Sequence, residues 1–171
     1  TFKFYAVAIS LKTYTNVNQE RNESLAIAYG RTSFNRYYYA CYLSARDLVK
    51  QLLPGTKFQH GAAPELIEKN VVQLIKQNSQ KQQKNGLINI REYSRIITTT
   101  NQSAAEIARI LRVGYMIRGI ADYEPEVIVV FKNDTFSLEK HTESEASSWL
   151  GAVDLHKGKI LRNAKELGIV S

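Results

Sequence analysis

An arginine and an aspartate lie where a helical pattern would place apolar residues. Apolar side chains recur at three- and four-residue spacing over residues 107–117, and the same spacing continues to Arg118 and Asp122. Charged groups on an inward face are costly unless they are paired. The planar guanidinium of Arg118 could hold a phosphate, with Asp122 orienting it. The alternative, which spacing alone favours, is a structural ion pair buried between helices, with Arg36 as a partner of Asp122 and Tyr123 hydrogen-bonded nearby.

The other reactive side chains do not form a catalytic or metal-binding pattern. His60, His141 and His156 are far apart in the sequence and lack the spacing of metal ligands. The sequence contains no phosphate-binding loop, no dinucleotide-binding glycine motif and no HExxH motif. We therefore expect no metal and no cofactor, and we expect all three histidines to be solvated. The single cysteine, Cys41, lies among tyrosines on a helical stripe, which predicts a buried structural thiol.

Composition restricts the class of protein and of partner. The net charge of +7, with a pI of about 9.5, makes a polyanion such as RNA or DNA a reasonable partner, although a charge surplus also serves solubility. Its 171 residues, 44% of them hydrophobic, suit one globular domain spanning residues 1–171. One cysteine suits a reducing, cytoplasmic location. Since no apolar run reaches the ~18 residues of a membrane span, we expect no membrane partner.

Helices are expected to position these groups. Residues 2–11 predict a first helix packed on two sides, with a buried strand as the alternative. Helical spacing from Phe34 to Leu52 predicts a second helix, which Pro54–Gly55 ends. Pro64 suits the first position of a third helix that includes residues 66–75. The polar, glutamine-rich segment 76–86 predicts a frayed helix end and a mobile loop.

The helix that carries Arg118 is expected to begin at about Ser103. Residues 87–97 are compatible with either a short helix or an extended segment, and the sequence does not decide between them. The run 98–101 breaks the apolar pattern and offers an N-cap. The helix then continues to Asp122, because Pro125 has no N–H and disfavours helix before it.

One extended segment and one last helix follow. The β-branched run 127–131 predicts a short extended excursion that ends at Asn133–Asp134. Thr142 and Glu145 have the spacing of a capping box, and the last helix is expected to run from there to about Gly168. Together these segments predict an all-α bundle of about five main helices.

Two short motifs occur in the order that is typical of a known family. The segments Arg36–Ala40 (RYYYA) and Arg118–Tyr123 (RGIADY) resemble HEPN domains. In that superfamily an early helix carries an R-x-YYA-like signature, and a later helix ends in R-x-x-A-D-Y or in R-x4-6-H. The resemblance extends from about Glu23 to Gly168, and the connection around His60 lies where relatives often carry a histidine.

The resemblance implies an all-α, up-and-down HEPN-like bundle that commonly dimerises and brings the arginine-bearing helices together. Many members are metal-independent ribonucleases of toxin–antitoxin, antiviral or abortive-infection systems, in which the arginine stabilises phosphate and a histidine acts as general acid and base. Other members lack the histidine and serve as binding or regulatory modules, often beside a minimal nucleotidyltransferase.

This sequence departs from the family at the histidine. The positions where a histidine would follow Arg118 hold Tyr123, Glu124 and Pro125. A tyrosine with an ordinary pKa near 10 is a poor base at neutral pH, whereas the pKa of histidine is about 6.5. The sequence therefore favours loss of ribonuclease activity, with substitution by another group such as His60 as the alternative.

Three functional hypotheses follow. The first is a HEPN-like module of a prokaryotic defence or toxin–antitoxin system, which acts as a homodimer and binds RNA, a nucleotidyltransferase-type partner or an antitoxin protein. Arg118 would contact phosphate, Asp122 and Tyr123 would organise it, and Arg36 and His60 would add nucleic-acid contacts. The second is a metal-independent endoribonuclease with Arg118, Asp122 and Tyr123 as catalytic residues. The third is a structural interaction domain.

Overall fold

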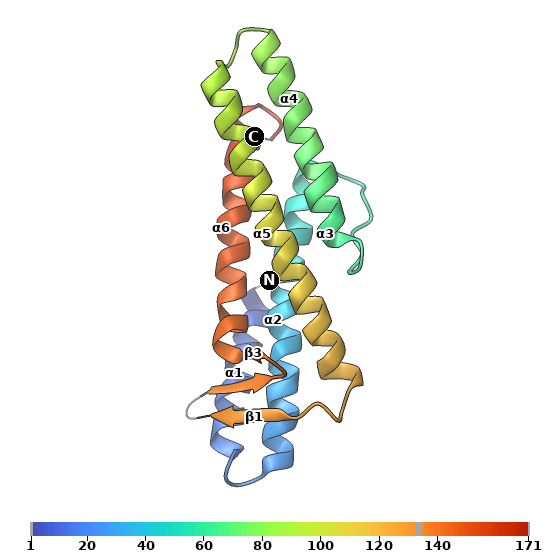
Figure 1. Cartoon of the computed structure of the whole chain (residues 1–171), viewed down its shortest axis with the longest axis vertical. Coiled ribbons are helices and arrows are strands. Elements are labelled where there is room, and N and C mark those ends of the chain that lie inside the picture. Colours follow the sequence, from blue (N-terminus) through green and yellow to red (C-terminus); the bar gives the residue numbers. More distant parts are fainter. Residues whose placement is uncertain (1, 133–134, 171) are drawn as a thin grey trace. The chain divides into compact units, whose positions relative to one another are not determined.

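The chain is mostly helical, with one small sheet (Figure 1). The computed structural model describes residues 2–132 and 135–170. The chain divides into two compact units, the first made of Thr1–Leu43 and Leu111–Gly151, the second of Ser44–Ile110 and Ala152–Ser171. Three helices, α2 (Glu23–Leu52), α5 (Ile90–Tyr123) and α6 (Glu143–Glu166), contribute residues to both units. The single domain expected for residues 1–171 stays a prediction.

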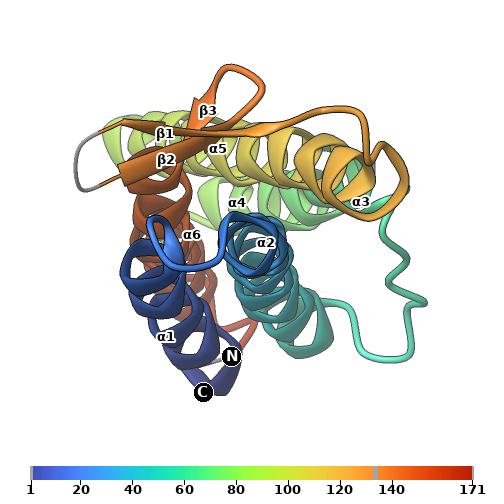
Figure 2. The ribbon, with the colours of Figure 1, turned by 90° about the horizontal axis from the view of Figure 1, so that it is seen from below.

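Helix α1 (Phe2–Asn18) belongs to the first unit and packs on one side only. It is longer than the predicted 2–11, and only its Ala8 and Thr15 are buried. The expectation of packing on two sides is therefore wrong. Figure 2 shows α1 beside the start of α2. Ring contacts show that the two helices run in opposite directions: Phe4–Tyr39, Tyr5–Tyr37 and Tyr14–Tyr29.

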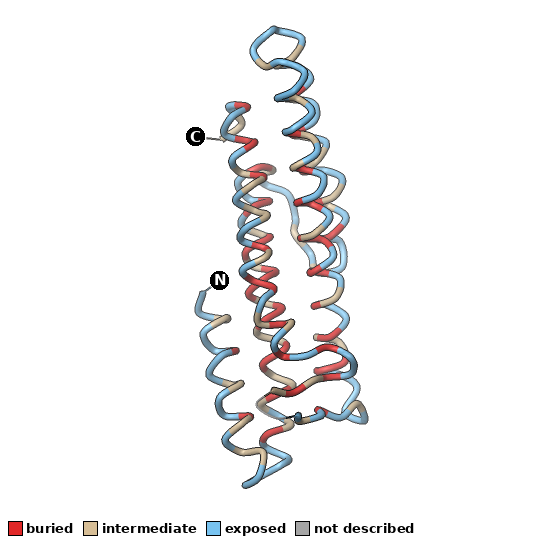
Figure 3. Tube along the Cα trace, turned by 60° about the vertical axis from the view of Figure 1, so that its left-hand side comes forward, coloured by how far each residue is buried: buried red, intermediate tan, exposed pale blue. Residues whose placement is uncertain are grey.

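Helix α2 begins eleven residues before the predicted Phe34, because Asn22 caps it. The Oδ1 atom of Asn22 accepts a hydrogen bond from the Leu25 amide at 3.1 Å. The predicted apolar stripe from Phe34 to Leu52 is buried, and so is Cys41, as expected. Figure 3 shows buried positions along the inner side of this helix and of its neighbours within each unit.

The third helical segment is continuous through the predicted mobile loop. It consists of α3 (Ala63–Leu66), the π-helical turn η1 (Ile67–Val71) and α4 (Val72–Lys84), with Pro64 in the first turn as predicted. The frayed end expected over residues 76–86 is wrong, since α4 continues to Lys84 and Gly86 follows it at a φ of +70°. Burial of Ile75 and Ser79 gives this glutamine-rich stretch an inner face that holds it helical.

Helix α5 begins at Ile90 with Asn89 as its cap, and not at the predicted cap over residues 98–101. Asn89 and Glu92 form a capping box, in which the Glu92 amide donates to Asn89 Oδ1 at 3.0 Å and the Asn89 amide donates to Glu92 Oε2 at 2.8 Å. The helix continues through 98–101 because Thr100 is buried there. The side-chain amide of Asn163 donates to the Thr100 hydroxyl at 3.0 Å and so pairs this polar group inside the second unit.

Three short antiparallel strands follow α5 in the first unit. They are β1 (Val129–Lys132), β2 (Thr135–Leu138) and β3 (His141–Thr142), in the order β1-β2-β3. Strand β1 confirms the predicted extended segment, whose expected end at 133–134 lies outside the described residues. Strands β2 and β3 were not predicted, so the all-α expectation is corrected to a mainly helical bundle with a small sheet.

The sheet packs against α2 at Gly30. A Cβ atom on Gly30 would approach Val129 Cγ1 to 3.3 Å and the ring of Phe136 to 3.4 Å. The rings of Phe34 and Phe136 meet edge to face, with centroids 5.9 Å apart. The small residue thus lets the sheet pack directly on the helix.

Helix α6 begins as the sequence predicts. The Glu145 amide donates to the Thr142 hydroxyl at 3.1 Å, as expected for the predicted cap. Helical spacing predicts that Ala146, Trp149, Leu150, Val153, Ile160, Leu161 and Ala164 face inward. All of them are buried except Leu161, which is only partly covered. Among the residues that the structure describes, five main helical segments are present, and none of them is long and apolar enough to cross a membrane.

Candidate functional site

The last turns of α5 bring together the three residues predicted to act as a unit. The Nε atom of Arg118 lies 2.8 Å from Asp122 Oδ2, and the two residues are one turn apart. The Nη2 atom of Arg118 donates to the Tyr123 hydroxyl at 3.3 Å. The guanidinium carbon also lies 5.4 Å from the centre of the Tyr123 ring, within reach of a cation–π contact. The guanidinium of Arg118 is thus held by one ion pair and one hydrogen bond to side chains of its own helix.

This cluster lies at the surface of the first unit. The side chains of Arg118 and Asp122 are 23% and 27% exposed, so the predicted buried pair is wrong in both burial and position. Burial lowers the pKa of Arg118, but the Asp122 carboxylate and the Tyr123 hydroxyl outweigh it, and the net pKa is raised. Arg118 therefore remains a cation that solvent can reach.

The partner of Asp122 on the neighbouring helix is Asn35, not the predicted Arg36. The side-chain amide of Asn35 donates to Asp122 Oδ1 at 2.5 Å. One residue further along α2 is a turn of about 100° around the helix axis, which directs Arg36 away from α5. The Arg36 guanidinium instead lies 5.7 Å from the ring centre of Phe4. There it borders a hollow of about 350 Å³ together with Lys3, Phe4 and Val7 of α1.

Arg31, which is not among the predicted site residues, caps the C-terminal end of α5. Arg31 of α2 donates four hydrogen bonds to backbone carbonyls. The last carbonyls of a helix have no intrahelical donor, and a cation there is favoured by the helix dipole. The sequence predicts a helix that begins at Phe34 and so does not include Arg31. In the structure Arg31 lies one turn before Phe34 on the same face of α2. The bonds run from Nε to Ala121 at 3.0 Å, from Nη1 to Val127 at 2.5 Å, and from Nη2 to Ile120 at 2.6 Å and Glu124 at 2.8 Å.

A buried carboxylate forms a second cluster in the first unit. Glu143, the first residue of α6, is fully buried. The Tyr37 hydroxyl donates to its Oε1 at 2.6 Å, and Lys12 Nζ lies 2.7 Å from its Oε2. Burial, and then the Glu143 carboxylate, raise the pKa of Tyr37. The cluster links α1, α2 and α6 through one hydrogen bond and one ion pair to the same carboxylate, which indicates a structural role. The sequence signal for it was only an acidic residue directly after a predicted cap.

The histidines are less solvated than expected. His141 is nearly buried, with its Nδ1 atom 3.1 Å from Glu145 Oε2. His156 in the second unit has its Nδ1 atom 3.2 Å from the Ser103 hydroxyl, and burial, with the nearby Lys159, lowers its pKa. His60 lies in the connection between α2 and α3, as predicted, and is half-buried. Of the three histidines, only His141 shares the first unit with Arg118, and it pairs with Glu145. In residues 2–132 and 135–170, no cluster of histidine, cysteine or acidic side chains could hold a metal ion.

Apolar side chains are exposed next to Arg118. Tyr115, Met116 and Tyr123 on α5 are all exposed. Gly119 lies among them, and a Cβ atom there would meet nothing within 4 Å. We call these four residues the α5 face. An exposed aromatic and methionine surface with a small residue at its centre has the composition of a protein–protein contact.

Comparison of the chain with protein-family models, with curated proteins and with solved structures finds no match. Function therefore has to be inferred from the side chains themselves.

Proposed function

We propose that the protein is a HEPN-like helical module that binds RNA through Arg118 and acts as a homodimer in a prokaryotic defence or toxin–antitoxin system. The support is a guanidinium whose plane is fixed by Asp122 and Tyr123 and which solvent can reach. Arginine forks of this kind suit the bidentate recognition of phosphate. The RYYYA and RGIADY motifs add the family resemblance.

One observation favours this function over a structural domain: other residues already hold α2 against the end of α5. Arg31 and Asn35 donate hydrogen bonds from α2 to α5, whereas the ion pair and the hydrogen bond of Arg118 are within α5. A partly exposed pair one turn apart stabilises a helix by only about 0.3–0.5 kcal/mol. Stability alone therefore does not account for the position of Arg118.

The α5 face supports the dimer in this proposal. Two copies that pack through Tyr115, Met116 and Tyr123 around Gly119 would bring two Arg118 side chains to one surface and cover apolar groups that the single chain leaves exposed. A nucleotidyltransferase-type protein or an antitoxin would compete for the same face.

The second candidate is a metal-independent endoribonuclease. The exposed Tyr123 hydroxyl, in contact with Arg118, is the observation that favours it. Binding is preferred over cleavage because His141, the histidine of the first unit, pairs with Glu145 and not with Arg118. A tyrosine is also an inefficient general acid or base at neutral pH.

The experiment is a titration of a fluorescent 20-nucleotide RNA, followed by anisotropy, with cleavage read on a gel in the presence of EDTA. Arg118→Ala is expected to weaken binding by about 10- to 100-fold, since a hydrogen bond to a charged group contributes about 1.5–3 kcal/mol. Arg109→Ala, which removes a guanidinium paired with Glu106 on the same helix, is the matched control. Cleavage that Arg118→Ala abolishes would establish the ribonuclease. A lower melting temperature with unchanged binding would establish the structural domain.

The dimer is tested separately by light scattering after gel filtration. Met116→Glu on the α5 face is expected to yield monomers, because it buries a charge in the proposed contact. Leu155→Glu, at an exposed apolar position of the second unit, is the control and should leave the mass unchanged.

A further inference from the structure

One segment of the chain carries charge of a single sign. Residues 69–91 contain five lysines and arginines and no aspartate or glutamate, whereas the whole chain has a net charge of +7. An ordinary solvated helix face mixes both signs. A segment of one sign instead creates a local field that attracts polyanions.

The structure gathers this segment on one exposed helix face in the second unit. The opposite side of η1 and α4 is buried through Val71, Ile75 and Ser79. The exposed positions recur every three or four residues, and we call them the α4 strip: Lys69, Gln73, Lys76, Gln77, Gln80, Lys81 and Lys84.

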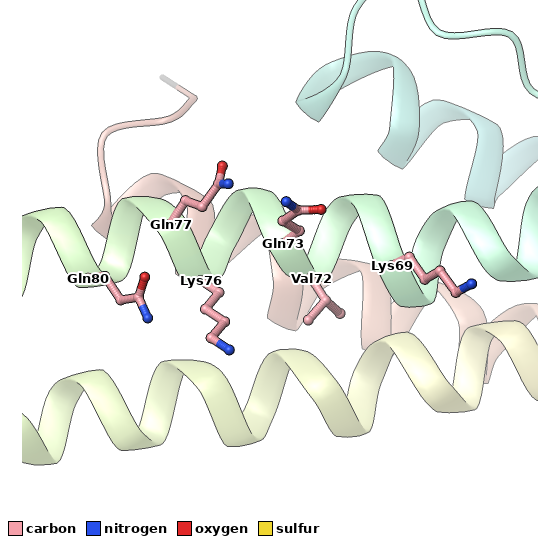
Figure 4. Close-up of a pocket in the computed structure, with 6 residues that line it drawn as sticks. All are labelled: Lys69, Val72, Gln73, Lys76, Gln77 and Gln80. Carbon is pink, nitrogen blue, oxygen red and sulfur yellow. The ribbon is translucent and has the colours of Figure 1, made fainter.

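The α4 strip is hollowed along its length. One hollow of about 420 Å³ extends from Lys69 to Gln80, and a second of about 280 Å³ extends from Gln77 to Asn85. They share Gln77 and Gln80 and so adjoin each other. Figure 4 shows Lys76 and Gln80 extending from the side of the helix that faces α5, and Gln73 and Gln77 from the other side.

Three of the lysines in the strip have no acidic partner. Glu65 neutralises Lys69 at 2.5 Å. Lys76, Lys81 and Lys84 form no ion pair with any side chain that the structure describes. From Lys76 to Lys84 the strip rises about 12 Å, at 1.5 Å per residue. The three available cations are spread over this rise and over an arc of about 140° around the helix, with Gln77 and Gln80 between Lys76 and Lys81.

The chemistry of the strip matches a ribose–phosphate backbone. Lysines contact phosphates, and glutamine amides donate to phosphate oxygens and both donate to and accept from a 2′-hydroxyl. The strip contains no aromatic side chain on which bases could stack, which indicates contacts independent of base sequence. Its exposed members also include no apolar side chain that could enter a lipid surface.

We propose that the α4 strip binds the RNA backbone without sequence preference, through Lys76, Lys81 and Lys84. This inference rests on the proposed function only in taking RNA as the ligand. The strip lies in the second unit and shares no residue with the Arg118 cluster.

The test compares two triple variants of equal charge by anisotropy with RNA 20-mers of two unrelated sequences, from 50 to 300 mM salt. Lys76→Gln, Lys81→Gln and Lys84→Gln together are expected to weaken binding of both RNAs at least 10-fold at 0.1 M salt. They should also reduce the slope of log affinity against log salt by about 2–3, one counterion for each lost phosphate contact. Lys50→Gln, Lys140→Gln and Lys165→Gln, all at exposed positions outside the strip, are the control and should change affinity less than threefold.

Parallel measurement of Arg118→Ala separates this inference from the proposed function. Loss of binding in both the strip variant and Arg118→Ala supports both. Loss in the strip variant alone supports the strip and overturns the Arg118 site, and loss in Arg118→Ala alone does the reverse. Equal losses in the two lysine triples overturn the strip, and so does binding of the wild type to phosphatidylserine vesicles but not to RNA.

Discussion

Two arginines contact the last turns of α5, and their contacts give them opposite roles. Arg31 directs its whole fork at backbone carbonyls and is a helix cap, whereas Arg118 is fixed by side chains of its own helix and remains open to solvent. Residue type and periodicity do not distinguish the two, because both lie on an apolar stripe. The difference lies in what each one touches.

Arg31→Met is expected to lower the free energy of unfolding by about 2–4 kcal/mol, because it leaves the final carbonyls of α5 without donors while keeping the volume of the side chain. Arg31→Lys should recover only part of this loss, since an ammonium keeps the charge but cannot serve four acceptors spread over the guanidinium plane. Urea denaturation measures both. Arg21→Met, at an exposed position, should change stability by less than about 0.5 kcal/mol. Equal effects of Arg31→Met and Arg21→Met would show that the cap contributes nothing.

At the scale of the element, two glycines of α5 make a matched pair. A Cβ atom on Gly114 would fall 2.8 Å from Tyr38 Cδ2, whereas one on Gly119 would meet nothing within 4 Å. Gly114→Ala is therefore expected to destabilise by about 1–3 kcal/mol, because α2 and α5 must move apart. Gly119→Ala should stabilise by about 0.5–1 kcal/mol through helix propensity. Thermal melting of the two variants should shift in opposite directions, and shifts of the same sign would contradict the close packing at Gly114.

The helix boundaries show what local sequence can predict. The cap at Thr142 was predicted because its oxygen serves an amide three residues away, which is a local interaction. Asn89 caps α5 in the same way, but the threonines at 98–100 offered a competing signal. Thr100 is instead buried inside the helix and accepts a hydrogen bond from the distant Asn163, which the local sequence does not reveal. The prediction of a frayed end and a loop in the glutamine-rich part of α4 is wrong for the same reason. The burial of Ile75 and Ser79, which holds this part helical, depends on tertiary contacts.

The residues of the candidate site also fall into two groups, those that local sequence predicts and those that depend on tertiary contacts. Arg118, Asp122 and Tyr123 were predicted to lie together because helical spacing alone places them within reach. Their neighbours Asn35 and Arg31 come from about 90 residues earlier in the chain, and choosing Asn35 over Arg36 requires the rotation of α2. Strands β2 and β3 were missed for a related reason, since their pairing and the packing of Phe136 on α2 are set by tertiary contacts.

At the scale of the whole molecule, charge controls both binding and stability. The α4 strip holds three lysines without an acidic partner among the residues that the structure describes, so the proposed RNA affinity should depend steeply on salt. Stability depends on pH through different groups. Hydrogen bonding to Lys157 lowers the pKa of Asp47, and hydrogen bonding to Arg109 lowers that of Glu106. A carboxylate whose pKa is lowered in the folded state stabilises the fold at any pH above the pKa that it has in the unfolded chain. The stability that Asp47 and Glu106 contribute is therefore lost only as the pH falls below about 4.5.

His156 sets a separate and higher pH window. Burial, and then repulsion from Lys159, lower its pKa below the ordinary value near 6.5, while Glu106 on α5 opposes this in part. The unfolded chain therefore binds a proton at a pH where the folded chain does not. The stability that neutral His156 contributes is complete above about pH 6.5 and is lost as the pH falls through the lowered pKa. His156→Gln keeps a polar partner for the Ser103 hydroxyl and removes the titration. Between pH 7.5 and 5 the midpoint of urea denaturation should fall less in this variant than in the wild type, and parallel curves would assign the decline to other groups.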